Sequence, residues 1–210
     1  CVHPAKNAVN KKRRTKIVVF VFMESPLFYL YLCKGNLFLK QTRKMYHKIS
    51  DFLNEWKRET ETTQKIFANL TDESLKQKVT TEGRSLGYLA WHIVITLGEM
   101  LNKGGLSVEA PDENSDPPNS AKDILGAYKK SSASLADEIG RKWTDEMLLD
   151  DIDMYGEKWK RWLLCHALIK HEIHHRAQMT VLMRQAGLKV PGAYGPSREE
   201  WGAFGMPEQR

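Results

Sequence analysis

The chain has 210 residues, which is enough for one well-buried domain and does not require two. Its formal net charge of +6 is unevenly distributed, because residues 1–44 contain ten Lys and Arg against one acidic residue, whereas residues 45–210 contain twenty-two against twenty-five. The excess positive charge belongs to the N-terminal segment, so it does not indicate a nucleic-acid-binding fold, and we expect no nucleic-acid partner.

The N-terminal segment contains an apolar stretch over residues 17–32 that Glu24 and Pro26 interrupt. A membrane-spanning helix needs about 20 predominantly apolar residues, so this stretch does not predict a membrane anchor. A signal peptide is the alternative, but no small-residue cleavage site follows the stretch. We expect residues 1–44 to be a poorly structured N-terminal extension outside the fold, with Met45 as the natural start.

Apolar residues recur at helical spacing in four segments of the remaining chain. Ser, Gly and Pro residues near the ends of these segments are typical of helix caps and loops. The predicted helices cover residues 46–70, 85–103, 121–140 and 157–186. No segment has the pattern of a convincing strand, so residues 45–210 are predicted to form an all-α fold, a four-helix bundle with a C-terminal tail.

The segments between the helices are predicted to be irregular. Residues 104–119 form a polar loop with three prolines, and the Gly- and Pro-rich residues 190–196 are expected to fold back over the bundle. Residues 143–156 form a connector with several acidic residues, which lack the glycine turn and closing Glu of a calcium loop. We interpret these acids as surface residues; they are Asp150, Asp151 and Asp153.

Cysteine usage indicates a reducing compartment. Cys165 is the only cysteine beyond residue 44, so no disulfide framework is possible in the predicted domain. We therefore expect a cytoplasmic protein. Cys165 lies in the last predicted helix, where we interpret it as a small core residue in preference to a catalytic thiol.

The last predicted helix carries a concentrated group of histidines. His171 and His175 are four residues apart, so they lie about 40° apart on one helix face and can share one metal ion. This face also carries Gln178 and several leucines, which places the two histidines in the buried stripe. His166 projects to the opposite side and His174 lies off-centre, so both are weaker ligand candidates.

A third ligand is expected, because a catalytic metal usually has three protein ligands and one open position. His92 in the second predicted helix is the best remaining candidate. On a helical wheel it lies on a line with Ser85, Thr96 and Glu99, away from the main aliphatic stripe. That line is equally compatible with a solvent-facing side, so periodicity leaves the role of His92 open.

Three segments carry a resemblance to a known family: LGYLAWH over residues 86–92, HEIHHRAQ over 171–178 and GLKVP over 187–191. In their order and spacing they resemble the DinB-like superfamily, which includes the YfiT-like proteins. The resemblance covers residues 45–205. It implies a four-helix bundle, often a homodimer, that holds nickel, zinc or a similar divalent ion.

The metal ligands that the resemblance implies are His92, His171 and His175 in this chain. The family's usual Arg-Gly-Gln after the last ligand is replaced here by Arg-Ala-Gln over residues 176–178, which we expect to leave coordination unchanged. Gln178 in this segment is a candidate for orienting bound water or for a structural hydrogen bond.

The function implied by the resemblance is that of a divalent-metal-dependent enzyme acting on small molecules. We expect a thiol S-transferase of the detoxification type, with a low-molecular-weight thiol as one substrate, slightly ahead of a hydrolase. Three neutral imidazoles leave the ion its full charge, which acidifies a bound thiol or water. Glu99 is a candidate for the same supporting role as Gln178.

Two alternatives come from other classes of protein. Residues 171–175 also match the H-E-x-x-H pattern of zinc peptidases, with Glu172 as general base and Glu199 or Glu200 as third ligand. The predicted absence of strands disfavours this interpretation. The other alternative is a non-catalytic metal-binding protein linked to the stress response.

Overall fold

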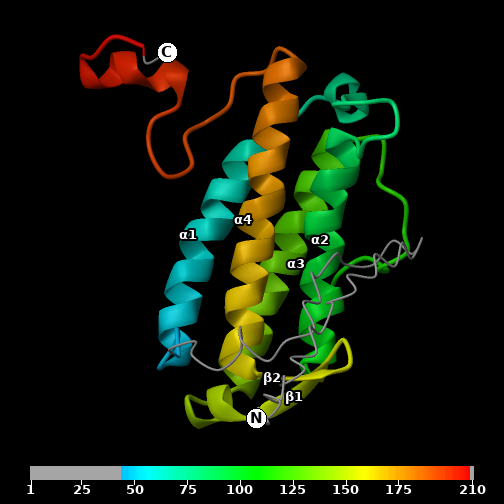
Figure 1. Ribbon diagram of the computed structural model, residues 1–210, viewed down its shortest axis with the longest axis vertical. Helices are drawn as coiled ribbons and strands as arrows, with labels where there is room; N and C mark the ends of the chain where they lie inside the picture. The colour runs from blue at the N-terminus through cyan, green and yellow to red at the C-terminus, as the bar shows by residue number, and fades with distance from the viewer. Residues whose placement is uncertain (1–43, 209–210) are drawn as a thin grey trace, which may run out of the picture. The chain divides into compact units, whose positions relative to one another are not determined.

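The computed structural model describes residues 44–208, which contain four long helices packed as a bundle (Figure 1). The predicted all-α four-helix bundle is confirmed, and each predicted helix is present with ends shifted by zero to four residues. The predicted N-terminal extension lies outside the described residues except for Lys44. The long helices are α1 (Ile49–Phe67), α2 (Leu86–Lys103), α3 (Ala121–Lys142) and α4 (Arg161–Gln185).

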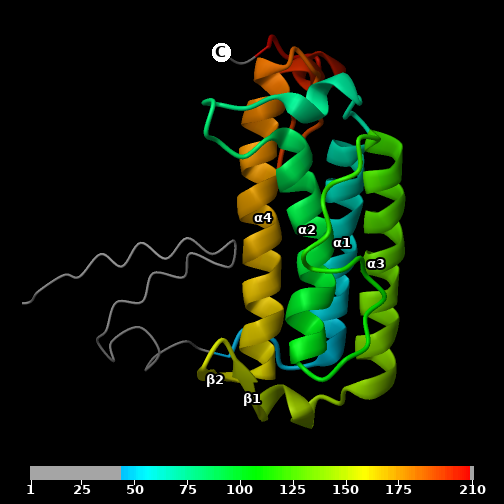
Figure 2. The same ribbon diagram turned by 90° about the vertical axis from the view of Figure 1, so that its right-hand side faces the viewer.

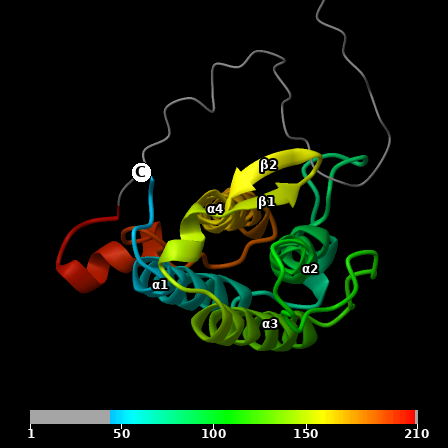
Figure 3. The same cartoon turned by 90° about the horizontal axis from the view of Figure 1, so that it is seen from below.

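The four helices form a closed ring around the core. Helix α2 packs against α3 and α4, and α1 also packs against α3 and α4, so α1 and α2 are diagonal to each other (Figure 3). Burial of a large apolar side chain contributes about 1.5 to 3 kcal/mol, so the inward stripes of the helices stabilise this arrangement. Core side chains that are at most 2% exposed include Phe52, Trp56, Leu97, Tyr128, Leu164 and Leu168.

The loop between α2 and α3 covers the outer side of α2 (Figure 2). The Trp91 indole N–H donates to the Ser115 carbonyl at 2.9 Å, which ties the loop to the helix. At Gly98 the loop comes so close that an added Cβ would lie 2.6 Å from the Ala110 Cβ. This cover explains why α2 is apolar on nearly all sides.

A short antiparallel hairpin precedes α4, and here the sequence prediction is wrong. Strands β1 (Asp151–Met154) and β2 (Glu157–Lys160) pair with Ile152 opposite Trp159, where a connector and the first turn of the last helix were predicted. The turn residues Tyr155 and Gly156 both have positive φ, 53° and 82°, as tight hairpin turns require. Buried residues alternate with exposed ones along β1, but a four-residue strand is too short for its period to be distinctive.

The acidic residues of the hairpin region are surface residues, as predicted. Each acidic residue pairs with a basic side chain on β2 or at the start of α4. The side chain of each of the three acids is more than half exposed. The N···O distances are 2.8 Å for Asp150–Arg161, 2.9 Å for Asp151–Lys160 and 2.6 Å for Asp153–Lys158.

The C-terminal tail folds back onto the bundle, as predicted. The Tyr194 hydroxyl donates to the Glu59 carboxylate at 2.8 Å and accepts from Arg176 at 2.6 Å. The tail then forms a short 3₁₀ helix, η3 (Arg198–Phe204). Two further 3₁₀ helices lie in the connections, η1 (Glu73–Lys76) and η2 (Glu146–Leu149).

Within residues 44–208, no helix has both the length and the apolar character that crossing a membrane requires.

The close approach at Gly98 predicts opposite effects for two glycine substitutions in helices. Ala is favoured over Gly in a helix by about 1 kcal/mol, so Gly126→Ala, with open space around the new Cβ, raises the free energy of unfolding by up to about that amount. Gly98→Ala lowers it by about 1 to 3 kcal/mol, because the methyl group displaces the loop at Ala110. Urea unfolding of both variants checks this, and an equal gain in both would contradict the described loop packing.

Candidate metal centre

Three histidines from two helices meet between α2 and α4. One ring nitrogen from each of His92, His171 and His175 lies within 4.8 Å of the other two. The Nε2 atoms of His92 and His171 are 3.1 Å apart, and the His175 ring centroid lies 4.7 Å from that of His92 and 4.4 Å from that of His171. The side of α2 that periodicity left open therefore faces α4 at His92.

The position of the cluster follows from local helix geometry and from the packing of α2 on α4. Residues four apart on a helix are neighbours on one face, so His171 and His175 necessarily project together from α4. His175 is buried, and the other two rings are partly buried. Because two of the three rings are partly exposed, a ligand from solvent can reach the histidines between α2 and α4.

The electrostatic environment keeps all three imidazoles neutral. The pKa values of His92, His171 and His175 are lowered to about 4, 2 and 4, mainly by burial and further by neighbouring histidines and Arg84. A neutral imidazole has a nitrogen lone pair for a metal, whereas an imidazolium has none. The three rings are therefore neutral at neutral pH, which is the charge that metal ligation requires.

Gln178 contacts the cluster as a partner of one histidine. Its side-chain oxygen lies 2.8 Å from Nδ1 of His175, and its amide nitrogen lies 3.1 Å from Nε2 of His174. An amide oxygen accepts, so Nδ1 of His175 carries the proton and its Nε2 keeps the lone pair. Such a contact fixes the ring orientation of a metal ligand, which is the structural hydrogen bond considered above for Gln178.

The donor set and its spacing fit a divalent ion. Two nitrogens at about 2.0 to 2.1 Å from one zinc ion are about 2.8 to 3.4 Å apart at bond angles near 90 to 110°. The 3.1 Å separation of the His92 and His171 nitrogens falls in this range. Neutral imidazole nitrogens suit zinc, nickel, copper and iron. The three histidines could therefore hold a metal ion.

Glu99 is placed away from the three histidines. It lies seven residues beyond His92, about 10 Å along α2. Its carboxylate accepts from the Tyr155 hydroxyl at 2.8 Å and pairs with Lys103 at 2.5 Å. These contacts link α2 to the hairpin turn, so they do not support a role for Glu99 in orienting water at the cluster.

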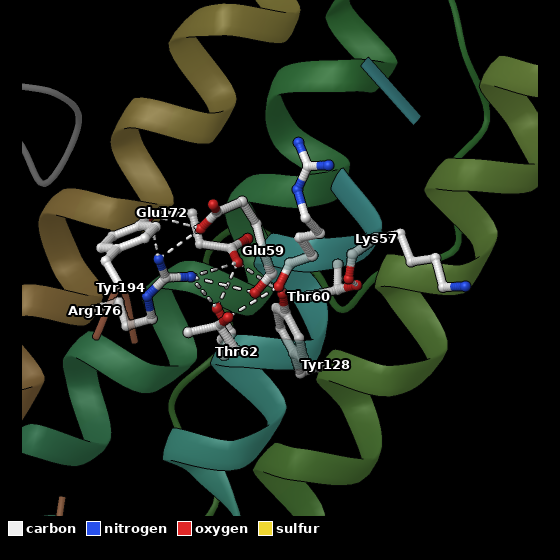
Figure 4. Close-up of polar contacts among 10 residues, drawn as sticks. Lys57, Glu59, Thr60, Thr62, Tyr128, Glu172, Arg176 and Tyr194 are labelled. Carbon is white, nitrogen blue, oxygen red and sulfur yellow. Dashed lines mark hydrogen bonds and ion pairs between the residues drawn. The ribbon is translucent and has the colours of Figure 1, made fainter. Parts of the chain in front are cut away.

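Glu172 lies on α4 among polar side chains of α1 and α3, as Figure 4 shows, and it is not part of the three-histidine cluster. It is 1% exposed and accepts from the Thr63 hydroxyl on α1 at 2.6 Å and from the Tyr128 hydroxyl on α3 at 2.8 Å. Burial raises the pKa of this carboxyl group. A peptidase base must face the metal, so the geometry does not support that alternative for Glu172.

The acids considered as a peptidase's third ligand are also engaged elsewhere. Glu199 pairs with Arg184 near the end of α4. Glu200 accepts from the backbone N–H of Gly192 at 3.1 Å and of Ser197 at 2.8 Å, both within the tail. The three-histidine set consequently remains the ligand set that the described geometry supports.

Arg176 is a structurally central residue that sequence reasoning gave no role. It is 2% exposed and pairs with the Glu59 carboxylate at 2.5 Å (Figure 4). It also donates to the Thr63 hydroxyl at 2.9 Å. A buried arginine must be paired, and Glu172 four residues earlier on the same helix was the available signal. Cys165, by contrast, is a buried free cysteine whose pKa is raised by burial, as predicted for a core residue.

Comparisons with known proteins agree with this fold. The sequence model of the DinB family matches residues 45–210. The chain is 43% identical over 162 residues to an uncharacterized protein, YrdA, of Bacillus subtilis strain 168, a match that covers 77% of this chain and 97% of that protein.

Solved structures show the same relationship. A crystal structure of a DinB-like protein from Bacillus cereus ATCC 10987 is 43% identical with a TM-score of 0.70, and the match covers 71% of this chain and all of that one. The DinB-like protein YjoA of Bacillus subtilis, 18% identical with a TM-score of 0.55, covers 68% of this chain and 97% of its own and supports the fold alone. The chain therefore belongs to the DinB family.

Proposed function

We propose that this protein is a divalent-metal-dependent enzyme that acts on small molecules, with His92, His171 and His175 as the metal ligands. The observation that carries the proposal is the convergence of three neutral imidazole nitrogens from two helices. When bound, a zinc or nickel ion would supply Lewis acidity, which lowers the pKa of a thiol or of water. The chain's own residues hold the ligands neutral and oriented, through burial and the Gln178 contact.

We further propose that the reaction is thiol transfer in preference to hydrolysis. A thiol has a pKa of about 8.5 and needs little further activation, whereas water has a pKa of about 15.7 and benefits from a general base. Among the described residues, Glu172, which was considered as a general base, and Glu99, which was considered for orienting water, are bound to other side chains. This arrangement favours a low-molecular-weight thiol as the nucleophile.

Removing one ligand at a time tests the metal site. His92→Ala, His171→Ala and His175→Ala each weaken the affinity for nickel or zinc by at least about 100-fold, because the ion loses one of three protein ligands. Elemental analysis and competition with a chelator measure this. His166→Ala is the matched control, since His166 lies on the same helix against Tyr46, at 6.4 Å between ring centroids. An ion retained by all three ligand variants would remove the basis of the proposal.

Metal affinity has a predictable pH dependence. Protons compete with the metal only below the histidine pKa values, which are lowered to about 4, 2 and 4. The metal affinity therefore changes little between about pH 7 and pH 5.5 and falls below about pH 4. If the three histidines had an ordinary pKa of about 6.5, the metal affinity would fall by about three orders of magnitude by pH 5.5. Titration of the metal-free protein with nickel at several pH values decides between these courses.

The reaction class is tested with the metal-loaded protein. We expect conjugation of a low-molecular-weight thiol to an electrophile, lost on chelation and restored by adding the metal back, and faster than hydrolysis of common esters. Glu172→Gln is expected to retain metal-dependent turnover in the protein that folds, because Glu172 faces α1 and α3. Complete inactivity with every physiological thiol and ester tried would favour a non-catalytic metal-binding protein.

A further inference from the structure

The cationic side chain of Arg84 lies near the three histidines. Arg84 directly precedes the N-cap of α2, and its guanidinium lies over the Tyr88 ring at 5.1 Å from the ring centroid. The Tyr88 ring in turn stacks on His92, at 6.0 Å between centroids and 12° between planes. Tyr88 and His92 are four residues apart on one face of α2, and Arg84 joins them through its contact with Tyr88, so the three side chains form one row that ends at the cluster.

The hydrogen-bond donors of Arg84 are not used by the part of the chain that the structure describes. Its side chain is exposed, and within residues 44–208 its recorded contact is the one with the Tyr88 ring. Arg176 and Arg161, by contrast, are paired with carboxylates. Stacking on an aromatic ring positions a guanidinium while its N–H groups stay available at the ring edge.

The charge balance at this row favours an anion. The three imidazoles are neutral, so a divalent ion held there keeps both of its positive charges. Arg84 adds a third positive charge, and it lies close enough to depress the pKa of all three histidines. A guanidinium presents two parallel N–H groups that match one carboxylate. A substrate with a carboxylate near its reactive group therefore complements both charges at once.

Resting on the proposed function, we propose that Arg84 binds the carboxylate of the small thiol substrate whose sulfur reaches the three-histidine cluster. Arg84 then acts as a specificity residue for carboxylate-bearing thiols. Tyr88 is a positioning residue that holds the guanidinium on the cluster side of α2.

Two thiols of equal length test this inference. 3-Mercaptopropionate carries a carboxylate, and 3-mercaptopropionamide replaces it with a neutral amide. The protein is loaded with cobalt, and the thiolate-to-cobalt absorption band reports the affinity for each thiol. We expect wild type to bind the carboxylate about threefold to tenfold more tightly than the amide, a preference that weakens with added salt.

Variants of Arg84 assign that preference to one side chain. Arg84→Gln lowers the ratio of the two affinities toward 1, leaving only the attraction of the metal ion for the carboxylate, while the affinities for cobalt and for the amide change less than about twofold. Arg84→Lys gives an intermediate ratio because it keeps the charge without the fork. Arg58→Gln is the matched control, an exposed arginine on α1, the helix diagonal to α2. It should keep the wild-type ratio.

The outcomes separate the two proposals. Cobalt binding with no preference for the carboxylate, or with a preference that Arg84→Gln keeps, overturns the role of Arg84 and leaves the metal site standing. Failure of wild type to bind cobalt, nickel or zinc overturns the proposed function and this inference with it.

Discussion

The rotation of α4 about its own axis is the constraint on which the candidate site depends. Each helical residue turns about 100°, so fixing the direction of one residue fixes its neighbours. Glu172 and Arg176 are held toward α1 and α3 by hydrogen bonds to Thr63, Tyr128 and Glu59. His171 directly precedes Glu172, and His175 directly precedes Arg176, so both histidines then face α2. The buried polar cluster thus specifies which side of α4 carries the candidate ligands.

As a result, α4 carries buried or partly buried polar side chains on two of its faces. On one face a buried arginine is paired with carboxylates, and breaking such a pair costs about 3 to 5 kcal/mol. On the other face three imidazoles converge within 4.8 Å, and their burial disfavours protonation. Neutral imidazoles that converge in this way can each turn a lone pair toward a shared cation. The ion-paired residues and the candidate metal ligands therefore lie on different faces of α4.

Most of the fold and the core of the site could be predicted from the sequence, since both depend on helical periodicity. His171 and His175 share a face in any helix, whereas the approach of His92 depends on how α2 packs, which periodicity cannot supply. The same limit applies to Glu99, whose wheel position matches that of His92 but whose partner Tyr155 lies in a hairpin too short to predict. The role of Arg176 was not predicted for a similar reason, because its partner Glu59 lies far away in the sequence, on α1.

The central claim is that one cation is held jointly by imidazoles of α2 and α4. Anomalous diffraction from crystals of the nickel-loaded protein, recorded on both sides of the nickel absorption edge, tests it most directly. The account predicts one strong peak about 2.0 to 2.2 Å from a ring nitrogen of each of His92, His171 and His175. A peak at surface carboxylates, or one that His92 does not reach, would contradict it.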